Sequence, residues 1–223
     1  MKLRRIALIG FVAATCAWAV WATLAKRNVA LDAHGRTRQF VIGSTLARVD
    51  DAIVVLGDSI VEASTLPRSL CGRTIVNAGI GGASTASHLG AILANALDGK
   101  RAALVVVSLG TNDAAIPNTT EQYRSNYRAL LAELAALTPR RAIAAIPPPE
   151  AGLQESGKAS AAVIDSYNAI LPALAEETRA TFIPLPGMPP KHTIDGIHLN
   201  AAGYAVWDKA ILAGIESALC KSS

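Results

Sequence analysis

The segment AIVVLGDSIVEAS, residues 52–64, places a serine directly after an apolar run. The run is typical of a buried strand, and it ends abruptly at Gly57, Asp58 and Ser59. We expect the chain to leave the core at this point, so that Ser59 presents its hydroxyl at the edge of a sheet. A serine hydroxyl becomes an effective nucleophile when a base removes its proton and a third group orients that base.

His198 is the histidine best placed to act as this base. It follows Asp195 by three residues in DGIH, and on a tight turn this spacing lets the carboxylate reach Nδ1 and leaves Nε2 for Ser59. An isolated Asp-x-x-His pair is also typical of a surface turn. Asn200 is predicted to cap the last helix. The other histidines lie in a linker, in a predicted helix and in a Pro-rich loop, respectively: His34, His88 and His192.

Two further loops carry hydrogen-bond donors suited to acyl transfer. The tetrahedral intermediate of such a reaction needs donors aimed at its oxyanion. Glycines in NAGIGGAS, residues 77–84, allow a backbone N–H to approach a ligand closely, and GTND, residues 110–113, presents the carboxamide of Asn112. The N–H of Ser59 is a third candidate. Taken singly, the glycines are also explained by turns and Asn112 by an Asx turn.

The elements that must position these groups alternate along the chain. Short apolar strands are predicted at residues 52–56, 74–78, 103–109, 141–146 and 181–185, and amphipathic helices at 84–97, 120–137, 160–178 and 200–219. Continuous apolar strands between such helices predict a three-layer α/β domain with a five-stranded parallel sheet. Each polar segment follows a strand, and the loops at the carboxyl ends of parallel strands form the binding crevice.

The blocks GDSI, NAGIGG, GTND and DGIHLN, in this order, resemble those of the GDSL or SGNH hydrolase superfamily. The resemblance covers about residues 52–215. It implies a flavodoxin-like α/β/α SGNH-hydrolase fold and a serine esterase that forms an acyl-enzyme. Ile60 stands where the family's name has leucine.

The resemblance also implies a role for each residue that matches a block. Ser59 would be the nucleophile, His198 the base and Asp195 its orienting partner. The oxyanion donors would be Ser59, Asn112 and Gly82, which lies five residues after Asn77, whereas Gly79 and Gly81 would be turn glycines.

Asp58 lies beside the predicted nucleophile without being needed as a second partner for His198. We interpret it as a structural acceptor for nearby backbone N–H groups. The sequence contains no metal-ligand cluster, phosphate-binding loop or dinucleotide fingerprint, so no cofactor is predicted.

The N-terminal segment, residues 1–27, is predicted to be a membrane anchor or a signal peptide. Residues 6–25 carry no charge, and this length crosses a hydrocarbon layer as a transmembrane helix. The basic residues before it predict a cytoplasmic N-terminus and a periplasmic catalytic domain in a bacterium. The motif AWA at 17–19 offers a cleavage site, after which the protein would be secreted. Residues 28–50 are predicted to be a juxtamembrane linker or helix, and residues 51–223 the hydrolase domain.

Charge and cysteine content narrow the class of protein. The net charge is +4, and residues 1–27 contain five cationic side chains and no acid, which leaves −1 for the rest. A near-neutral body without a basic stripe argues against nucleic-acid binding.

Cys71 and Cys220 form an even pair outside the apolar segment. In an oxidising compartment this favours a disulfide over two buried thiols.

The loops after the third and fourth strands are short, which predicts an open site and a short acyl group. We expect acetyl esters of cell-envelope or extracellular polysaccharide. Three alternatives stay open. An O-acyltransferase would use the same triad, a lysophospholipase or thioesterase would need an apolar groove lined by Ile60, Ile116 and Pro117, and a non-catalytic glycan-binding protein would need no matched nucleophile and base.

Overall fold

The computed structural model describes residues 33–220. The predicted membrane segment, residues 6–25, lies outside the described residues. Within residues 33–220, no helix is long and apolar enough to cross a membrane.

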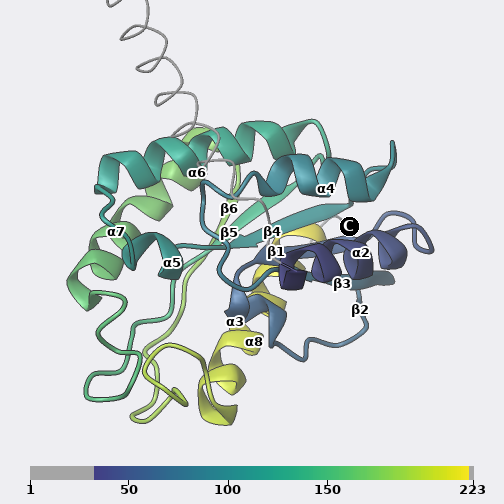
Figure 1. Ribbon diagram of the computed structural model, residues 1–223. Coiled ribbons are helices and arrows are strands. Elements are labelled where there is room, and N and C mark those ends of the chain that lie inside the picture. Colours follow the sequence, from purple (N-terminus) through teal and green to yellow (C-terminus); the bar gives the residue numbers. More distant parts are fainter. Residues whose placement is uncertain (1–32, 221–223) are drawn as a thin grey trace, which may run out of the picture. The chain divides into compact units, whose positions relative to one another are not determined.

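A mixed sheet of six strands forms the centre of the structure (Figure 1). Its order is β2 (Ser69–Leu70), β3 (Arg73–Gly79), β1 (Ile53–Gly57), β4 (Leu104–Ser108), β5 (Arg141–Ala144) and β6 (Thr181–Ile183). The five predicted strands are all present and parallel to one another, in the order of a flavodoxin-like sheet.

The prediction of a five-stranded, purely parallel sheet is wrong in one respect, because β2 adds a sixth strand antiparallel to β3. The two strands are joined by Cys71 and Gly72, whose φ angles are 51° and 72°. Positive φ at both central residues is typical of the tight hairpin turns that match strand twist. A two-residue strand is too short to show a periodic pattern, which is why the sequence did not reveal it.

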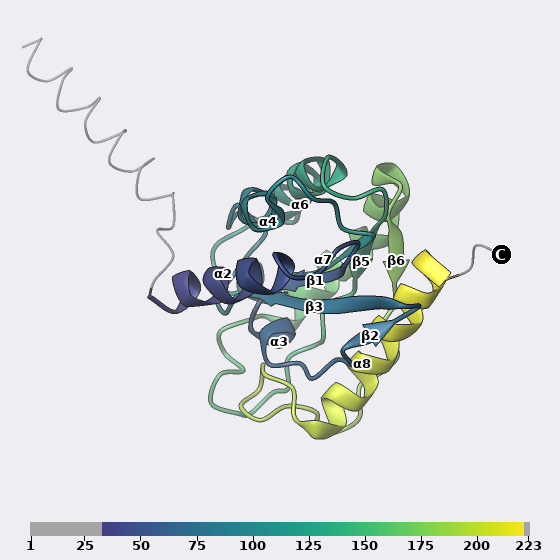
Figure 2. The ribbon, with the colours of Figure 1, turned by 90° about the vertical axis from the view of Figure 1, so that its right-hand side faces the viewer.

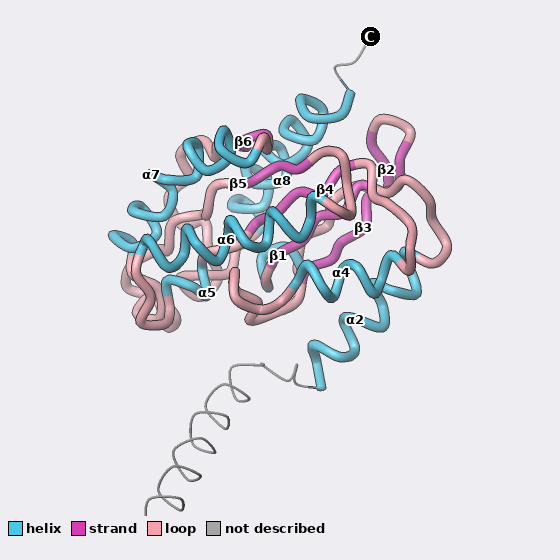
Figure 3. The backbone as a smooth tube through the Cα atoms, turned by 90° about the horizontal axis from the view of Figure 1, so that it is seen from above, coloured by secondary structure: helices cyan, strands magenta, loops and turns pink. Residues whose placement is uncertain are grey.

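Helices cover both faces of the sheet, which gives three layers. Figure 2 shows α2 (Ala33–Leu46), α4 (Leu89–Leu97) and α6 (Thr120–Ala135) on one face, and α3 (Ser59–Glu62) and α8 (Ala201–Ile215) on the other. The helix α7 (Ala161–Thr178) packs beside α6, and the short α5 (Thr111–Ala114) follows β4 (Figure 3).

The starts of two helices show how the residues around them set where a helix begins. The side chain of Asn200 accepts hydrogen bonds from the N–H groups of Ala202 and Gly203, at 2.9 and 3.1 Å, which confirms the predicted cap of α8. The predicted helix 84–97 instead begins at Leu89, because His88 has a φ of 52°. His88 is therefore a residue before the helix rather than a residue within it.

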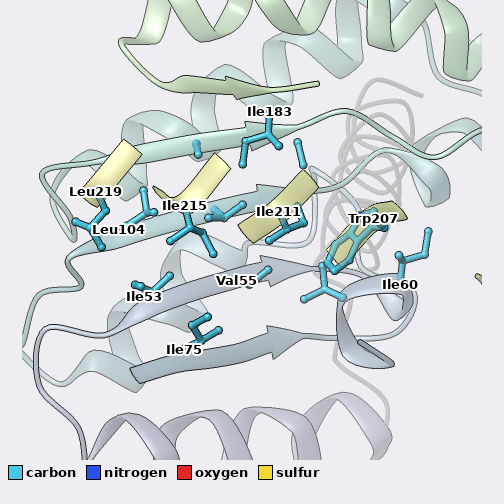
Figure 4. Packing of buried hydrophobic residues seen from close by; sticks show 14 of the residues in the cluster. Ile53, Val55, Ile60, Ile75, Leu104, Ile183, Trp207, Ile211, Ile215 and Leu219 are labelled. Atoms are coloured by element: carbon cyan, nitrogen blue, oxygen red, sulfur yellow. The ribbon is translucent and has the colours of Figure 1, made fainter. Parts of the chain in front are cut away.

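The core on the α8 face consists of alternate residues of the strands (Figure 4). Trp207, Ile211 and Ile215 of α8 are fully buried in the same cluster as Ile53 and Val55 of β1. Burial of such large side chains contributes about 1.5–3 kcal/mol each. This packing fixes α8, and with it the loop that precedes it.

Strand register brings the ends of three strands to one level. Gly57 at the end of β1 pairs with Gly79 of β3 on one side and with Ser108 of β4 on the other. The three loops that carry the predicted site residues therefore leave the sheet side by side.

Residues 33–46, expected to belong to a linker or helix without chemistry, form α2, which packs against α4 and β3. Ile42 and Leu46 are buried. At the end of the helix, Lys100 Nζ donates to the carbonyls of Leu46 and Ala47 at 3.3 and 3.1 Å. A cation at this position satisfies carbonyls that have no partner within the helix. The helix is therefore part of the folded unit.

A disulfide joins Cys71, in the turn between β2 and β3, to Cys220, at the end of the π-helix η1 (Glu216–Cys220). The two Cα atoms lie 5.9 Å apart, and the cysteines are separated by 149 positions. The bridge ties the edge of the sheet to the C-terminal helical segment. Closing so long a loop restricts the unfolded chain.

Candidate active site

Ser59 is the first residue of α3, and only Asp58 separates it from the buried strand β1. The helix can start so close to the sheet because Gly57 has no side chain, where a Cβ would collide with Val61 and the Ser108 carbonyl. Asp58 caps the helix by accepting the Ile60 N–H at 2.9 Å. The N–H of Ser59 is in the first turn, where backbone N–H groups have no acceptor within the helix.

A chain of hydrogen bonds links the predicted nucleophile, base and acid. Ser59 Oγ lies 3.0 Å from His198 Nε2, and His198 Nδ1 lies 2.7 Å from Asp195 Oδ2. Asp195 Oδ1 also accepts the backbone N–H groups of Ile197 and His198, at 3.0 and 2.8 Å. Partial burial opposes ionisation of Asp195, but these hydrogen bonds outweigh it and lower its pKa to about 2. Asp195 is thus held as a carboxylate.

The loop that carries Asp195 and His198 is itself held against the loop after β5. Glu150 Oε2 accepts the backbone N–H and the hydroxyl of Thr193, at 2.9 and 2.8 Å. These hydrogen bonds lower the pKa of Glu150. The two ring nitrogens of His192 lie 3.0 and 2.9 Å from the carbonyls of Pro189 and Pro148. His192 therefore has a structural position in this loop.

Gly82 and Asn112, the predicted oxyanion donors, lie in neighbouring loops. Gly82 has a φ of +77°, and nothing lies within 4 Å of the position that a Cβ would occupy there. Glycine is thus required by the backbone conformation rather than by crowding. Asn112 Nδ2 donates to the carbonyl of Ala83, the next residue, at 2.9 Å. This bond ties α5 to the loop after β3, and the Asn112 amide has a second N–H.

Gly79 has a different role from the turn glycine expected at this position. It is the last residue of β3, and a Cβ there would collide with the backbone of Glu62. The glycine lets α3 pack directly on the strand. Asn77 strengthens this contact, because its Nδ2 donates to the carbonyl of Val61 at 2.7 Å.

A cavity of about 680 Å³ is lined by Ser59 and His198 and by further residues that the sequence did not indicate. The latter include Glu62, His34, Ile194 and Tyr204. His34 was assigned to a linker, yet α2 brings it beside Glu62, with 2.9 Å between Nε2 and Oε1. The only local signal for Ile194 is its place beside Asp195, and its side chain is 71% exposed at the rim.

Ile60 does not line an apolar groove, contrary to the alternative considered for a long-chain substrate. It is 2% exposed and belongs to the core cluster with Trp207. Its backbone carbonyl accepts the hydroxyl of Tyr204 at 2.8 Å, which connects α3 to α8. Ile116 is exposed, at 54%.

Two buried carboxyl groups lie behind the site. Asp58 is 2% exposed, and burial raises its pKa to about 7, helped by the nearby charge of Asp113 and opposed by the Ile60 N–H and His198. Burial likewise raises the pKa of Asp113, whose carboxylate accepts the Thr85 hydroxyl at 2.5 Å. Among residues 33–220, no group of three or more His, Cys, Asp or Glu side chains is arranged to hold a metal ion.

Comparison with known proteins identifies the family. Residues 55–206 match the sequence profile of the GDSL-like Lipase/Acylhydrolase family. The chain belongs to this family. The chain is therefore a hydrolase of the GDSL-like type. No curated protein sequence matches the chain significantly.

Solved structures share the fold of this GDSL-like domain. A Streptococcus pneumonia protein described as a platelet activating factor is 23% identical, with a TM-score of 0.65, over 92% of this chain and 98% of that chain. An Enterococcus faecalis lipase/acylhydrolase is 20% identical, with a TM-score of 0.61, over 74% and 95%. A mutant acetyl-xylooligosaccharide esterase from Geobacillus Stearmophilus is 19% identical, with a TM-score of 0.59, over 74% and 94%.

Replacement of Asp58 by Asn is expected to reduce the pH dependence of stability of this GDSL-like domain. Asn keeps an acceptor for the Ile60 N–H but has no proton to release. The pKa of Asp58 rises from 3.8 in its ordinary state to about 7 on folding. Between pH 3.8 and about pH 7 the unfolded chain has lost this proton while the folded protein still holds it. The free energy of unfolding of the wild-type protein therefore falls as the pH rises through this range.

Urea unfolding of wild type and Asp58→Asn at about pH 5 and about pH 8 measures this linkage. The free energy of unfolding of Asp58→Asn, taken relative to that of wild type, should be larger at the higher pH than at the lower one. Asp58→Ala serves as the control that also loses the cap, at a cost of about 1 kcal/mol. A difference between wild type and Asp58→Asn that does not change with pH would contradict the expectation.

Proposed function

We propose that the chain cleaves carboxylic esters through an acyl-enzyme formed on Ser59. The observation that carries the proposal is the hydrogen-bonded series from Asp195 through His198 to Ser59, with 2.7 Å and 3.0 Å at its two links. These distances are those of a nucleophile in contact with its base and a base in contact with its orienting carboxylate.

The proposed reaction has two halves. Ser59 Oγ attacks the acyl carbonyl while His198 Nε2 accepts the hydroxyl proton, and Asp195 stabilises the resulting imidazolium. The oxyanion receives hydrogen bonds from the N–H of Ser59, the N–H of Gly82 and Nδ2 of Asn112. His198 then protonates the departing alcohol. In the second half a water molecule gives a proton to His198 and attacks the acyl carbon, and the bond from this carbon to Ser59 Oγ breaks as His198 returns the proton to Oγ, which releases the carboxylic acid.

The proposed substrate is an acetyl or other short-chain ester on cell-envelope or extracellular polysaccharide. The buried position of Ile60 removes one of the residues that would line a groove for a long acyl chain. The cavity of about 680 Å³ combines polar side chains, among them Glu62 and His34, with the apolar Ile194. The fold that the chain shares with an acetyl-xylooligosaccharide esterase is compatible with this substrate class.

Replacement of Ser59 by Ala is expected to abolish both labelling by a fluorophosphonate probe and ester hydrolysis, without unfolding the protein. The wild-type enzyme should turn over p-nitrophenyl acetate and butyrate faster than the palmitate. Ser69→Ala, in the exposed β2 turn region, is the matched control and should keep labelling and turnover. Labelling that survives in Ser59→Ala would show that Ser59 is not the nucleophile. A preference for palmitate would show that the enzyme does not prefer a short acyl group.

Replacement of Asn112 by Ala is expected to lower kcat by roughly 10²–10³ with little change in KM, because the donor matters most to the developing oxyanion. Asn95→Ala, on the exposed surface of α4, is the matched control. Steady-state kinetics on p-nitrophenyl acetate and a thermal melt of each variant provide the measurement. An unchanged kcat in Asn112→Ala would show that this side chain does not stabilise the oxyanion.

We also propose that residues 6–25 anchor the chain in the bacterial inner membrane, with the catalytic domain in the periplasm. The support is the charge-free apolar stretch in the sequence and the disulfide between Cys71 and Cys220, a bond typical of oxidising compartments.

The full-length protein is therefore expected to resist carbonate extraction, to retain its first residues and to be digested by protease added to the outer face of the inner membrane. Cys71 and Cys220 should react with a thiol reagent only after reduction. A soluble product that begins near Val20 would show instead that the preceding residues are a signal peptide.

A further inference from the structure

Glu62 lies at the end of α3, the helix that begins with Ser59, and it reaches the loop after β3. Its Oε2 accepts the backbone N–H of Gly81 at 2.7 Å. Gly81 directly precedes Gly82, the proposed oxyanion donor. A single carboxylate thus connects the helix of the nucleophile to the backbone that would bind the oxyanion.

Two side chains of α2 also contact this carboxylate. Glu62 Oε1 lies 2.9 Å from His34 Nε2 and 3.5 Å from Arg38 Nε. The side chains of Glu62 and Arg38 are only 20% and 18% exposed. The pair is therefore less screened by water than an ordinary surface ion pair.

Arg38 also binds the end of β3, from which the glycine loop departs. Its Nε donates to the carbonyl of Gly79 at 2.9 Å, and its Nη2 donates to the carbonyl of Asn77 at 3.2 Å. The guanidinium has several donors in a rigid plane, so it can bind Glu62 and the strand end together. The loop is consequently held at its start by Arg38 and at Gly81 by Glu62.

We propose that Glu62 is a positioning residue, which sets the backbone of Gly81 and Gly82 for oxyanion binding, and that Arg38 and His34 of α2 keep its carboxylate in place. This inference rests on the proposed ester hydrolysis at Ser59. Gly81 and Gly82 lie between the buried residues Ile80 and Ala83 and have no side chains that could hold their own N–H groups in place. Glu62 holds this segment from outside the loop at the Gly81 N–H, and Asn112 holds it at the Ala83 carbonyl.

Glu62→Ala is expected to lower kcat on p-nitrophenyl acetate by about tenfold or more, because a displacement of about 1 Å at a reacting centre has effects up to about 10²-fold. KM should stay within about twofold, since substrate binding does not depend on the oxyanion donor. Glu62→Gln keeps an oxygen that can accept the Gly81 N–H, and it should recover most of the lost kcat. Rates are divided by the amount of fluorophosphonate-reactive protein, which restricts them to folded sites.

Glu177→Ala is the matched control. Glu177 of α7 is also a carboxylate paired with two basic side chains of a neighbouring helix, at 2.6 Å from Arg128 and 3.3 Å from Arg124. Its loss should leave kcat unchanged. If Glu62→Ala does not fold, Arg38→Ala replaces it, with the same fall in kcat at constant KM expected.

A wild-type kcat in Glu62→Ala, or in Arg38→Ala where that variant replaces it, would overturn the positioning role. So would a rise in KM at constant kcat that differs between acetyl esters of different alcohols, because Glu62 would then contact the substrate itself. These outcomes are distinct from failure of the proposed function, which is signalled by turnover that persists in Ser59→Ala.

Discussion

The hydrogen bond between Ser59 Oγ and His198 Nε2 joins residues that are 139 positions apart, at a distance of 3.0 Å. Ser59 lies at the start of a short helix and His198 in a loop. The distance between them therefore depends on how β1, α3 and α8 pack. β1 fixes the start of α3, and the core packing of Trp207 fixes α8, which begins just after His198. The hydroxyl of Tyr204 then binds the carbonyl of Ile60 and connects the two helices directly.

The second half of the loop between β6 and α8 is held by several hydrogen bonds, which suits a loop that carries the proposed base. Asn200 caps α8 at the end of the loop, and Glu150 binds Thr193 near its middle. Between them, the carboxylate of Asp195 accepts backbone N–H groups of its own turn and the Nδ1–H of His198. The same hydrogen bonds that shape the turn also keep Asp195 ionised, so structure and charge are established together.

Close approach between α3 and the sheet explains the glycines and the buried acid around Ser59. Gly57 and Gly79 remove the side chains that would keep the helix away from β1 and β3. The first N–H groups of so short and buried a helix need an acceptor, and Asp58 supplies one to Ile60. The consequence is a buried carboxyl group whose pKa is raised to about 7, an electrostatic cost of placing Ser59 at the edge of the sheet.

Local sequence patterns determined where the five parallel strands and their helices follow one another along the chain. The spacing of Asp195 and His198 indicated a pair on one turn. These features depend on neighbours within a few positions, so periodicity and turn chemistry reveal them. The residues themselves indicated Asn112 as a candidate oxyanion donor, and the resemblance to a hydrolase superfamily added Gly82. The geometry of both depends on neighbouring loops.

Tertiary structure alone decided the rest. It brought Cys71 and Cys220, which the sequence favoured as a pair, within bonding distance, and it added the two-residue β2. It also buried Ile60 in the core and brought His34 and Arg38 of α2 to Glu62. In the sequence, His34 is 28 positions from Glu62, and neither its type nor its neighbours indicate a contact. Such contacts arise only when helices and strands pack into one core, because packing sets which surfaces meet and local propensity does not.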